Sequence, residues 1–250
     1  MLKLSPDPIW QELGRSGMMA AVHPREGHPL RETNPLKLVY IAVAAFFALW
    51  TVWVLVLLQW PGAFSGDALP QTFLRAGVRI VLWLGPLAVY AAMVERQGFG
   101  GLFGFEEQWR RGLWGALALT VLCGVLALAR HYLLGAAVED PRTWSASTWI
   151  NPILLAPIME ELLFRGFLYR KMAPDTGPWP ALIVSSFLFA LIHVPYWVLS
   201  GNLSGMPLLG EFVTIFLIGA ILAVSLRVSG SVLTPIGGHL ANNFFSGWAP

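Results

Sequence analysis

The sequence predicts an all-α membrane protein, a polytopic transmembrane bundle of about seven helices, with eight as the alternative. Hydrophobic residues make up 56% of the 250 residues and charged residues only 12%, whereas a soluble domain has roughly 25% charged residues. The apolar residues gather in runs of about 20, the length of a helix that crosses a bilayer core. These runs must be helices, because lipid cannot satisfy the backbone groups of an open strand.

The candidate spans follow one another along the chain, with Gly/Pro-rich breaks between them. The clearest apolar run is Leu36 to Gln59. No break is long enough to be a second domain, so we expect one transmembrane domain over residues 36–250. The further candidate spans are Thr72–Val94, Gly112–Leu134, Trp149–Arg170, Trp179–Leu199, Glu211–Leu226 and Ser231 to the end.

Residues 1–35 form a polar tail without the apolar core of a cleaved signal peptide. Lys and Arg favour the cytoplasmic side of a membrane. Several lie in or beside this tail, whereas the connection from Trp60 to Gln71 has none. We therefore expect a cytoplasmic tail, an outer C-terminus if the spans are seven in number, and Arg75 and Arg79 near the outer end of the second span. The basic residues of the tail region are Lys3, Arg15, Arg25, Arg31 and Lys37.

The charge and cysteine content argue against two other classes of protein. The formal net charge is only +2, and the basic residues form no single stripe, so we expect no nucleic-acid partner. The single cysteine, Cys123, lies within an apolar run. It cannot form an internal disulfide and belongs to no Cys-rich metal site.

Ionisable side chains inside a span cost several kcal/mol unless they are paired or hydrated, so they mark candidate sites. The fourth span carries Glu160, Glu161 and Arg165. Residues four apart share a helix face, so we expect Glu161 to pair with Arg165. Glu160, turned about 100° away, is then left as the free carboxylate. The alternative for Arg165 is an anchor at the membrane surface.

Two later spans carry histidines. Phe189 precedes His193 by four residues, and Asn243 follows His239 by four, so we expect an aromatic ring and an amide to orient the two imidazoles. At about 1.5 Å per residue, Glu160 lies roughly 17 Å, His193 roughly 21 Å and His239 roughly 12 Å from the predicted cytoplasmic ends of their helices. The candidate residues are therefore expected in one layer. His131, near the outer end of its span, fits a structural histidine instead.

These residues can supply the parts of peptide hydrolysis, namely a base for water, an oxyanion donor and a proton for the leaving amine. Glu160 would be the general base, and His193 would hold the water or return a proton. His239 and Asn243 would stabilise the oxyanion. A carboxylate and two imidazoles are also a ligand set for Zn²⁺. Glu160, His193 and His239 are therefore a candidate site for Zn²⁺ or another divalent metal, and metal dependence stays open.

The ordered motifs resemble those of the CAAX prenyl endoproteases and bacteriocin-processing enzymes, whose signature is Glu-Glu-x-x-x-Arg, then Phe-x-x-x-His, then His-x-x-x-Asn. The resemblance implies an intramembrane protease with its core at about residues 148–250 and a conical cavity open to the cytoplasmic side. In that reading Glu160 activates water, and His193, His239 and Asn243 complete the site. Supporting residues are Glu161, Arg165 and Phe189.

The leading hypothesis for function is an intramembrane endopeptidase that cleaves a membrane-embedded or membrane-associated protein or peptide. The alternatives are a non-catalytic immunity or regulatory membrane protein of the same fold, and a proton-coupled transporter. The transporter alternative is weaker because the chain has no two-half repeat. The lipid bilayer is the other expected partner, in the inner membrane of a bacterium or archaeon. The motifs do not distinguish between prenylated tails, leader peptides and sorting signals as substrates.

Overall fold

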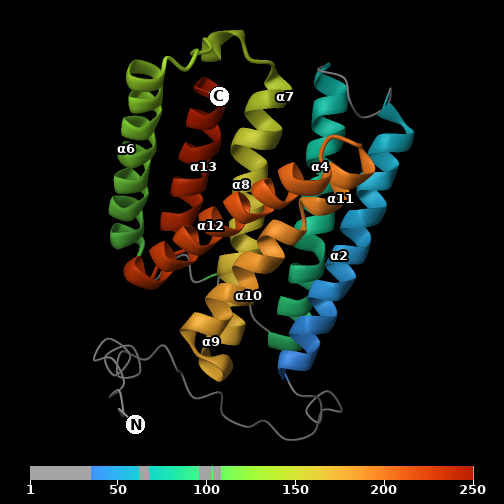
Figure 1. Cartoon of the computed structure of the whole chain (residues 1–250). Helices are drawn as coiled ribbons and strands as arrows, with labels where there is room; N and C mark the ends of the chain where they lie inside the picture. Colours follow the sequence, from blue (N-terminus) through green and yellow to red (C-terminus); the bar gives the residue numbers. More distant parts are fainter. Residues whose placement is uncertain (1–34, 62–67, 96–102, 104–107, 250) are drawn as a thin grey trace, which may run out of the picture. The chain divides into compact units, whose positions relative to one another are not determined.

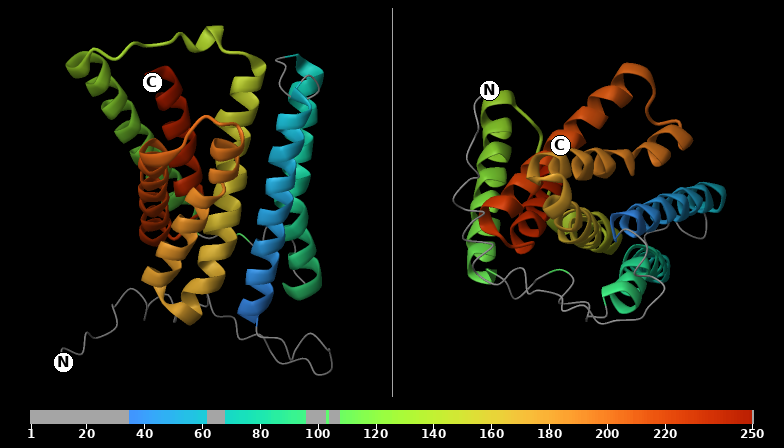
Figure 2. Two further views of the ribbon diagram at one scale, coloured as in Figure 1. Left: turned by 45° about the vertical axis from the view of Figure 1, so that its right-hand side comes forward. Right: turned by 90° about the horizontal axis from the view of Figure 1, so that it is seen from below.

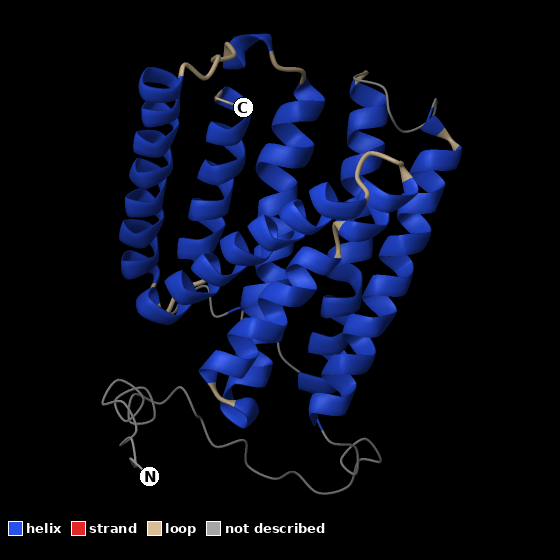
Figure 3. Cartoon of the chain, viewed as in Figure 1, coloured by secondary structure: helices blue, strands red, loops and turns tan. Residues whose placement is uncertain are grey.

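The computed structural model describes residues 35–61, 68–95, 103 and 108–249. Every regular element in these ranges is a helix (Figures 1 and 3), which confirms the predicted all-α class. Residues Pro35–Pro250 form one compact unit. The predicted polar tail falls almost wholly on residues 1–34, outside the described residues, and its cytoplasmic position stays a prediction.

The first three predicted spans are long helices. They are α2 (Pro35–Gln59), α4 (Leu69–Tyr90), which continues as the π-helix η2 (Ala91–Glu95), and α6 (Trp109–Leu134). Hydropathy predicted their ends to within about three residues. A proline lies in the first turn of α4, where its missing N–H costs no helical hydrogen bond.

The fourth predicted span is a helical segment that alternates between α and π turns. Prolines lie inside it at positions 152 and 174, and proline breaks the regular i to i−4 ladder because it has no N–H. Every residue from Leu162 to Tyr169 is buried. This segment is therefore surrounded by protein over its central part. Its elements are α7 (Ala146–Thr148), η4 (Trp149–Leu155), α8 (Ala156–Glu161), η5 (Leu162–Tyr169) and α9 (Arg170–Thr176).

The C-terminal part consists of four further helices. They are α10 (Pro178–Leu191), the short α11 (Val194–Leu199), α12 (Gly205–Ser229) and α13 (Leu233–Trp248). Figure 2 shows α12 running obliquely across the bundle. The fifth predicted span is thus broken between α10 and α11, at Ile192 and His193. Pro195 lies just after this break and pre-sets the first turn of α11.

Five helices among the described residues are long and apolar enough to cross a membrane. They correspond to the first, second, third, fifth and sixth predicted spans. The fourth span is absent from this set because it carries buried charges among protein neighbours, and α13 because it has only 16 residues. The chain is an integral membrane protein. The other two predicted spans, the fourth and the last, are helical but do not meet the length and composition of a membrane span.

Small residues let α6 and α13 approach each other closely. A Cβ on Gly237 would lie 3.1 Å from Ala116 Cα, and one on Gly238 would lie 3.2 Å from Leu119 Cβ. Small residues at a helix contact are typical of membrane bundles, where backbones must come close for van der Waals packing. This contact fixes the position of α13, which carries two of the candidate site residues.

An aromatic cluster joins α2 and α4 to the fourth segment. The ring of Trp83 meets Phe46, Trp50 and Phe164 in edge-to-face contacts, with centroids 4.7, 5.3 and 6.4 Å away. Such pairs add roughly 0.5–1.5 kcal/mol each beyond their buried area. The N-terminal helices are therefore held against the segment that carries the glutamates.

Candidate active site

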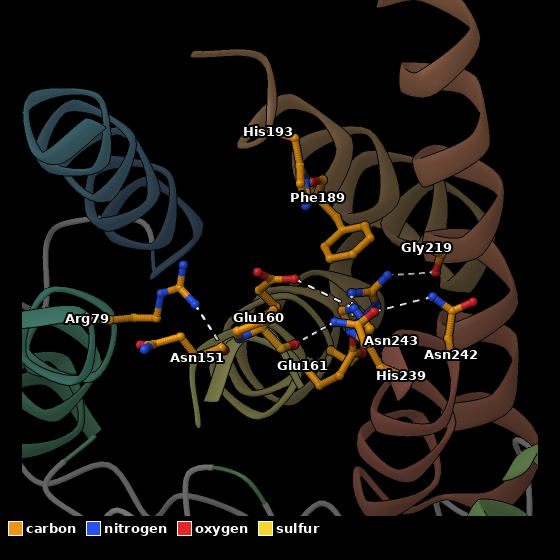
Figure 4. A network of polar contacts seen from close by, with 12 residues as sticks. Arg79, Asn151, Glu160, Glu161, Phe189, His193, Gly219, His239, Asn242 and Asn243 are labelled. Atoms are coloured by element: carbon orange, nitrogen blue, oxygen red, sulfur yellow. Dashed lines mark hydrogen bonds and ion pairs between the residues drawn. The ribbon is translucent and has the colours of Figure 1, made fainter. Parts of the chain in front are cut away.

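The structure brings the predicted site residues together around one cavity of about 370 Å³. Glu160 contributes from the end of α8, His193 from the break after α10, and His239 and Asn243 from α13 (Figure 4). Phe189 also lines the cavity. Three separate helical segments therefore meet at one place, as the depth argument predicted.

Glu161 is the hub of the polar network. Its Oε1 accepts a hydrogen bond from Arg165 Nη1 at 2.9 Å and another from His239 Nδ1 at 2.8 Å. The carboxylate is fully buried. The predicted pair of Glu161 with Arg165 is confirmed, and the link to His239 adds a function for this glutamate that helical spacing alone did not indicate.

Arg165 is a core residue. It is fully buried, so the alternative of an anchor at the membrane surface is wrong. Its Nη2 donates to Gly219 O at 2.8 Å, and its guanidinium lies over the ring of Phe189, 4.3 Å from the centroid. Gly219 permits this approach, because a Cβ there would lie 3.0 Å from both Arg165 Nη2 and Phe189 Cδ1.

His239 points its second nitrogen at Glu160. Since a carboxylate only accepts, the contact with Glu161 places a proton on Nδ1 and turns Nε2 toward the cavity. Nε2 lies 3.8 Å from Glu160 Oε2. This separation is too long for a direct hydrogen bond, and both groups line the cavity. Glu160 is itself 7% exposed, so it is shielded from bulk water.

His193 is held by the last turn of α10 and by two aromatic rings. Its Nδ1 donates to Phe189 O at 3.0 Å, because a carbonyl only accepts. The imidazole stacks on Trp197 at 5.4 Å and meets Phe189 edge to face at 5.4 Å. The predicted role of Phe189 as an aromatic wall is confirmed by these contacts. Nε2 remains available to the cavity.

Asn243 makes a contact different from the expected one. We expected it to orient His239, but Glu161 does this, and Asn243 Nδ2 donates to Pro152 O at 2.8 Å. In η4 the backbone bonds run from residue i to i−5, as Ala156 N–H to Asn151 O shows. The corresponding donor for Pro152 O would be residue 157, which is a proline and has no N–H. Asn243 satisfies this carbonyl and ties α13 to η4.

Metal dependence stays a prediction, and it concerns the three donors named from the sequence. Glu160, His193 and His239 all line the cavity. However, within the ranges that the structure describes, no three His, Cys, Asp or Glu side chains lie close enough to hold one ion. The Nδ1–H bond of His239 to Glu161 is compatible with a metal ligand at Nε2, since metal-bound histidines usually donate their other N–H to such a group. The donors do not fit a three-ligand zinc site, and no step below uses a metal.

Arg79 is a site residue that the sequence reading missed. It was expected near the outer end of its span, but it lines the same cavity as Glu160. It donates through Nη1 to Asn151 O at 3.3 Å and lies over the Trp50 ring, 5.7 Å from the centroid. The rule that marks in-span charges as candidate sites would have found it, had it been applied to the second span.

The cavity extends from Glu160 toward one end of the bundle. From Glu160 it extends past Ala156 to Asn151 on the fourth segment, and past Trp50 to Leu57 on α2. A second cavity of about 310 Å³ continues to Pro61, just after the end of α2. Both cavities therefore lie toward the end of the bundle where α2 ends and α4 begins. With a cytoplasmic N-terminus this is the outer side, so the two sequence expectations of a cytoplasmic tail and a cytoplasmic opening exclude each other.

The fold and the site define a helical integral membrane protein with a buried carboxylate and histidine network at the base of a cavity. Comparison with known families agrees with the motifs. Residues 142–245 match the family model of type II CAAX prenyl endopeptidase Rce1-like proteins. The predicted family resemblance is therefore confirmed for this segment, which holds the glutamates, both histidines and Asn243.

One curated relative extends this comparison. The UPF0177 protein YbdI of Lactococcus lactis subsp. lactis is 33% identical over 105 residues, which is 36% of this chain and 56% of that protein. The chain thus spans little more than half of the length of this relative. No solved structure matches the chain.

Proposed function

We propose that the protein is an intramembrane endopeptidase that hydrolyses a peptide bond of a membrane-associated protein with water activated by Glu160. The observation that carries the proposal is the facing pair of Glu160 Oε2 and His239 Nε2, 3.8 Å apart at the base of a cavity. The match of residues 142–245 to a CAAX endopeptidase family supports the same reaction class.

In the proposed reaction Glu160 takes a proton from water and later returns it to the leaving group. Water bound between Glu160 and His239 attacks the carbonyl carbon of the peptide bond while Glu160 takes its proton. The oxyanion that forms accepts hydrogen bonds from His239 Nε2–H and from Asn243 Nδ2, which has a second hydrogen beyond the one given to Pro152 O. Breakage of the C–N bond follows, and Glu160 returns the proton to the leaving amine.

Glu161 and Arg165 are positioning residues in this scheme. His239 donates at Nε2 only when both of its nitrogens carry protons, and the Glu161 carboxylate at Nδ1 stabilises this imidazolium. Arg165 holds Glu161 in place and balances its charge. His193, with Nε2 facing the cavity, would hold the substrate or the water on the other side of Glu160.

The test is cleavage of membrane peptides by the purified full-length protein in lipid vesicles, followed by mass spectrometry. Glu160→Gln keeps the shape of the side chain and removes the base, so product formation should fall by at least about 100-fold. Glu211→Gln is the matched control, because Glu211 is an exposed residue of α12 and should leave cleavage unchanged. Full cleavage by the Glu160→Gln protein would refute the proposal and favour a non-catalytic membrane protein of the same fold.

A further inference from the structure

Arg79 lies where the two cavities join. It lines the cavity that contains Glu160 and also the adjoining cavity of about 310 Å³, together with Leu57, Asn151 and Tyr196. A molecule that reaches from Glu160 into the second cavity must therefore pass the guanidinium group. Figure 4 shows Arg79 extending from α4 toward the segment that carries Glu160.

The charge of Arg79 is incompletely compensated by the described residues. A guanidinium has five N–H donors and stays protonated, whereas Arg79 makes one hydrogen bond, to the Asn151 carbonyl at 3.3 Å. No carboxylate among the residues that the structure describes forms an ion pair with it. The Glu160 carboxylate attracts Arg79 without an ion pair between them, so the guanidinium keeps donors for a further anion, and charged groups at membrane depth mark binding sites.

A second arginine, Arg75, lines the second cavity. Arg75 lies one helical turn from Arg79, on the same side of α4, and lines the second cavity with it. Arg75 Nη2 donates to Ser147 Oγ at 2.6 Å, which holds the side chain against the fourth segment. The opposite wall is apolar, with Trp53, Leu57 and Leu58. An apolar wall lowers the local dielectric constant and strengthens the attraction between the arginines and an anion.

We infer that the second cavity is a binding subsite for a carboxylate of the peptide substrate, and that Arg79 is the residue that binds it. The inference rests on the proposed function, since the anion must belong to the molecule that also reaches Glu160. A carboxylate matches the fork of donors that a guanidinium presents. The subsite is built by α2, α4, the start of the fourth segment and Tyr196 of α11. Both arginines belong to α4 and lie outside the family-matched residues 142–245.

The experiment measures binding and requires no turnover. The probe is an N-dansyl trileucine peptide with a free terminal carboxylate, compared with its amide and with an amide that carries one glutamate. Energy transfer from tryptophan to dansyl reports binding, because Trp50 and Trp197 line the cavity. The wild-type protein and Glu160→Gln should bind the free acid roughly 10- to 100-fold more tightly than the amide. Tight binding of the glutamate amide would assign the carboxylate to a side chain, and weak binding would assign it to the chain terminus.

Three variants test whether Arg79 binds the carboxylate. Arg79→Gln should bind acid and amide equally, Arg79→Lys should keep part of the preference, and the exposed control Arg130→Gln should keep all of it. Equal binding of all three peptides by the wild-type protein would overturn the subsite, and so would an unchanged preference in a folded Arg79→Gln protein. If Arg79→Gln does not fold, Arg79→Lys decides, since a point charge should bind the carboxylate less tightly than the fork does. Failure of the proposed function is seen separately, as full cleavage by Glu160→Gln.

Discussion

The two adjacent glutamates, Glu160 and Glu161, have different surroundings. Glu161 is fully buried and accepts from both Arg165 and His239, whereas Glu160 faces the cavity. Helical spacing predicted the first half of this division, because Glu161 and Arg165 lie four residues apart. The link to His239 crosses from α8 to α13 and depends on how the two helices pack. Residue spacing within one helix does not predict that packing.

Glu161→Gln is predicted to impair both the fold and the reaction. The amide can still accept from Arg165, but it leaves a buried cation without its counter-charge, which costs about 3–5 kcal/mol. The Nδ1–H of His239 also loses its carboxylate partner, so cleavage should fall even in the folded fraction. Unfolding in detergent and cleavage per folded molecule measure the two effects. The control Glu95→Gln, which removes the partly exposed ion pair with Lys171, should cost no more than about 1 kcal/mol.

The histidines allow a second prediction at the scale of single residues. Because the described donors do not surround one ion, we expect cleavage to survive incubation with EDTA or 1,10-phenanthroline. His239→Asn should nevertheless abolish it, since Nε2 faces Glu160. His131→Asn is the matched control, because the described contacts of the His131 ring, with Tyr132 and with Ala136 O, lie outside the cavity. Loss of cleavage in chelator that returns with added Zn²⁺ would contradict this prediction and restore the metal hypothesis.

At the scale of elements, hydropathy predicted the helices well and their irregularities poorly. The π turns of η4 and the break at His193 lie at prolines, which a count of apolar residues does not register. These irregularities matter for the site. Asn243 meets Pro152 O because Pro157 provides no N–H, and His193 lies at the cavity because α10 ends before it. Proline spacing in the sequence was the available signal.

Two glycines, Gly237 in the contact between α6 and α13 and Gly210 outside it, give predictions of opposite sign. Gly237→Ala places a Cβ against the backbone of Ala116 and should destabilise the protein by about 1–3 kcal/mol through overpacking. Gly210→Ala, in an exposed part of α12 with no atom within 4 Å of the new Cβ, should stabilise it by up to about 1 kcal/mol through helix propensity. Unfolding midpoints in detergent compare the two. Equal shifts would mean that close packing does not hold α13.

At the scale of the whole molecule, the charge pattern and the cavity determine which side of the membrane the substrate reaches. Basic residues gather at the end of the bundle where α2 begins and α9 ends, whereas the cavities extend to the other end. From the preference of Lys and Arg for the cytoplasm, we expect the basic end to be cytoplasmic and the cavity to face outward. The basic residues at that end are Lys37, Arg110, Arg111, Arg170, Lys171 and Arg227.

We therefore predict that the cavity is reached from the outer side of the membrane, and labelling of intact cells checks it. A Cys123→Ser background removes the single native cysteine, and Leu58→Cys then places a thiol in the second cavity. A membrane-impermeant maleimide should label this thiol in intact cells, and a cysteine at Lys171 only after lysis. The reverse pattern would place the tail outside and the cavity on the cytoplasmic side. The cytoplasmic opening implied by the family resemblance would then hold, and the orientation derived from charge would be wrong.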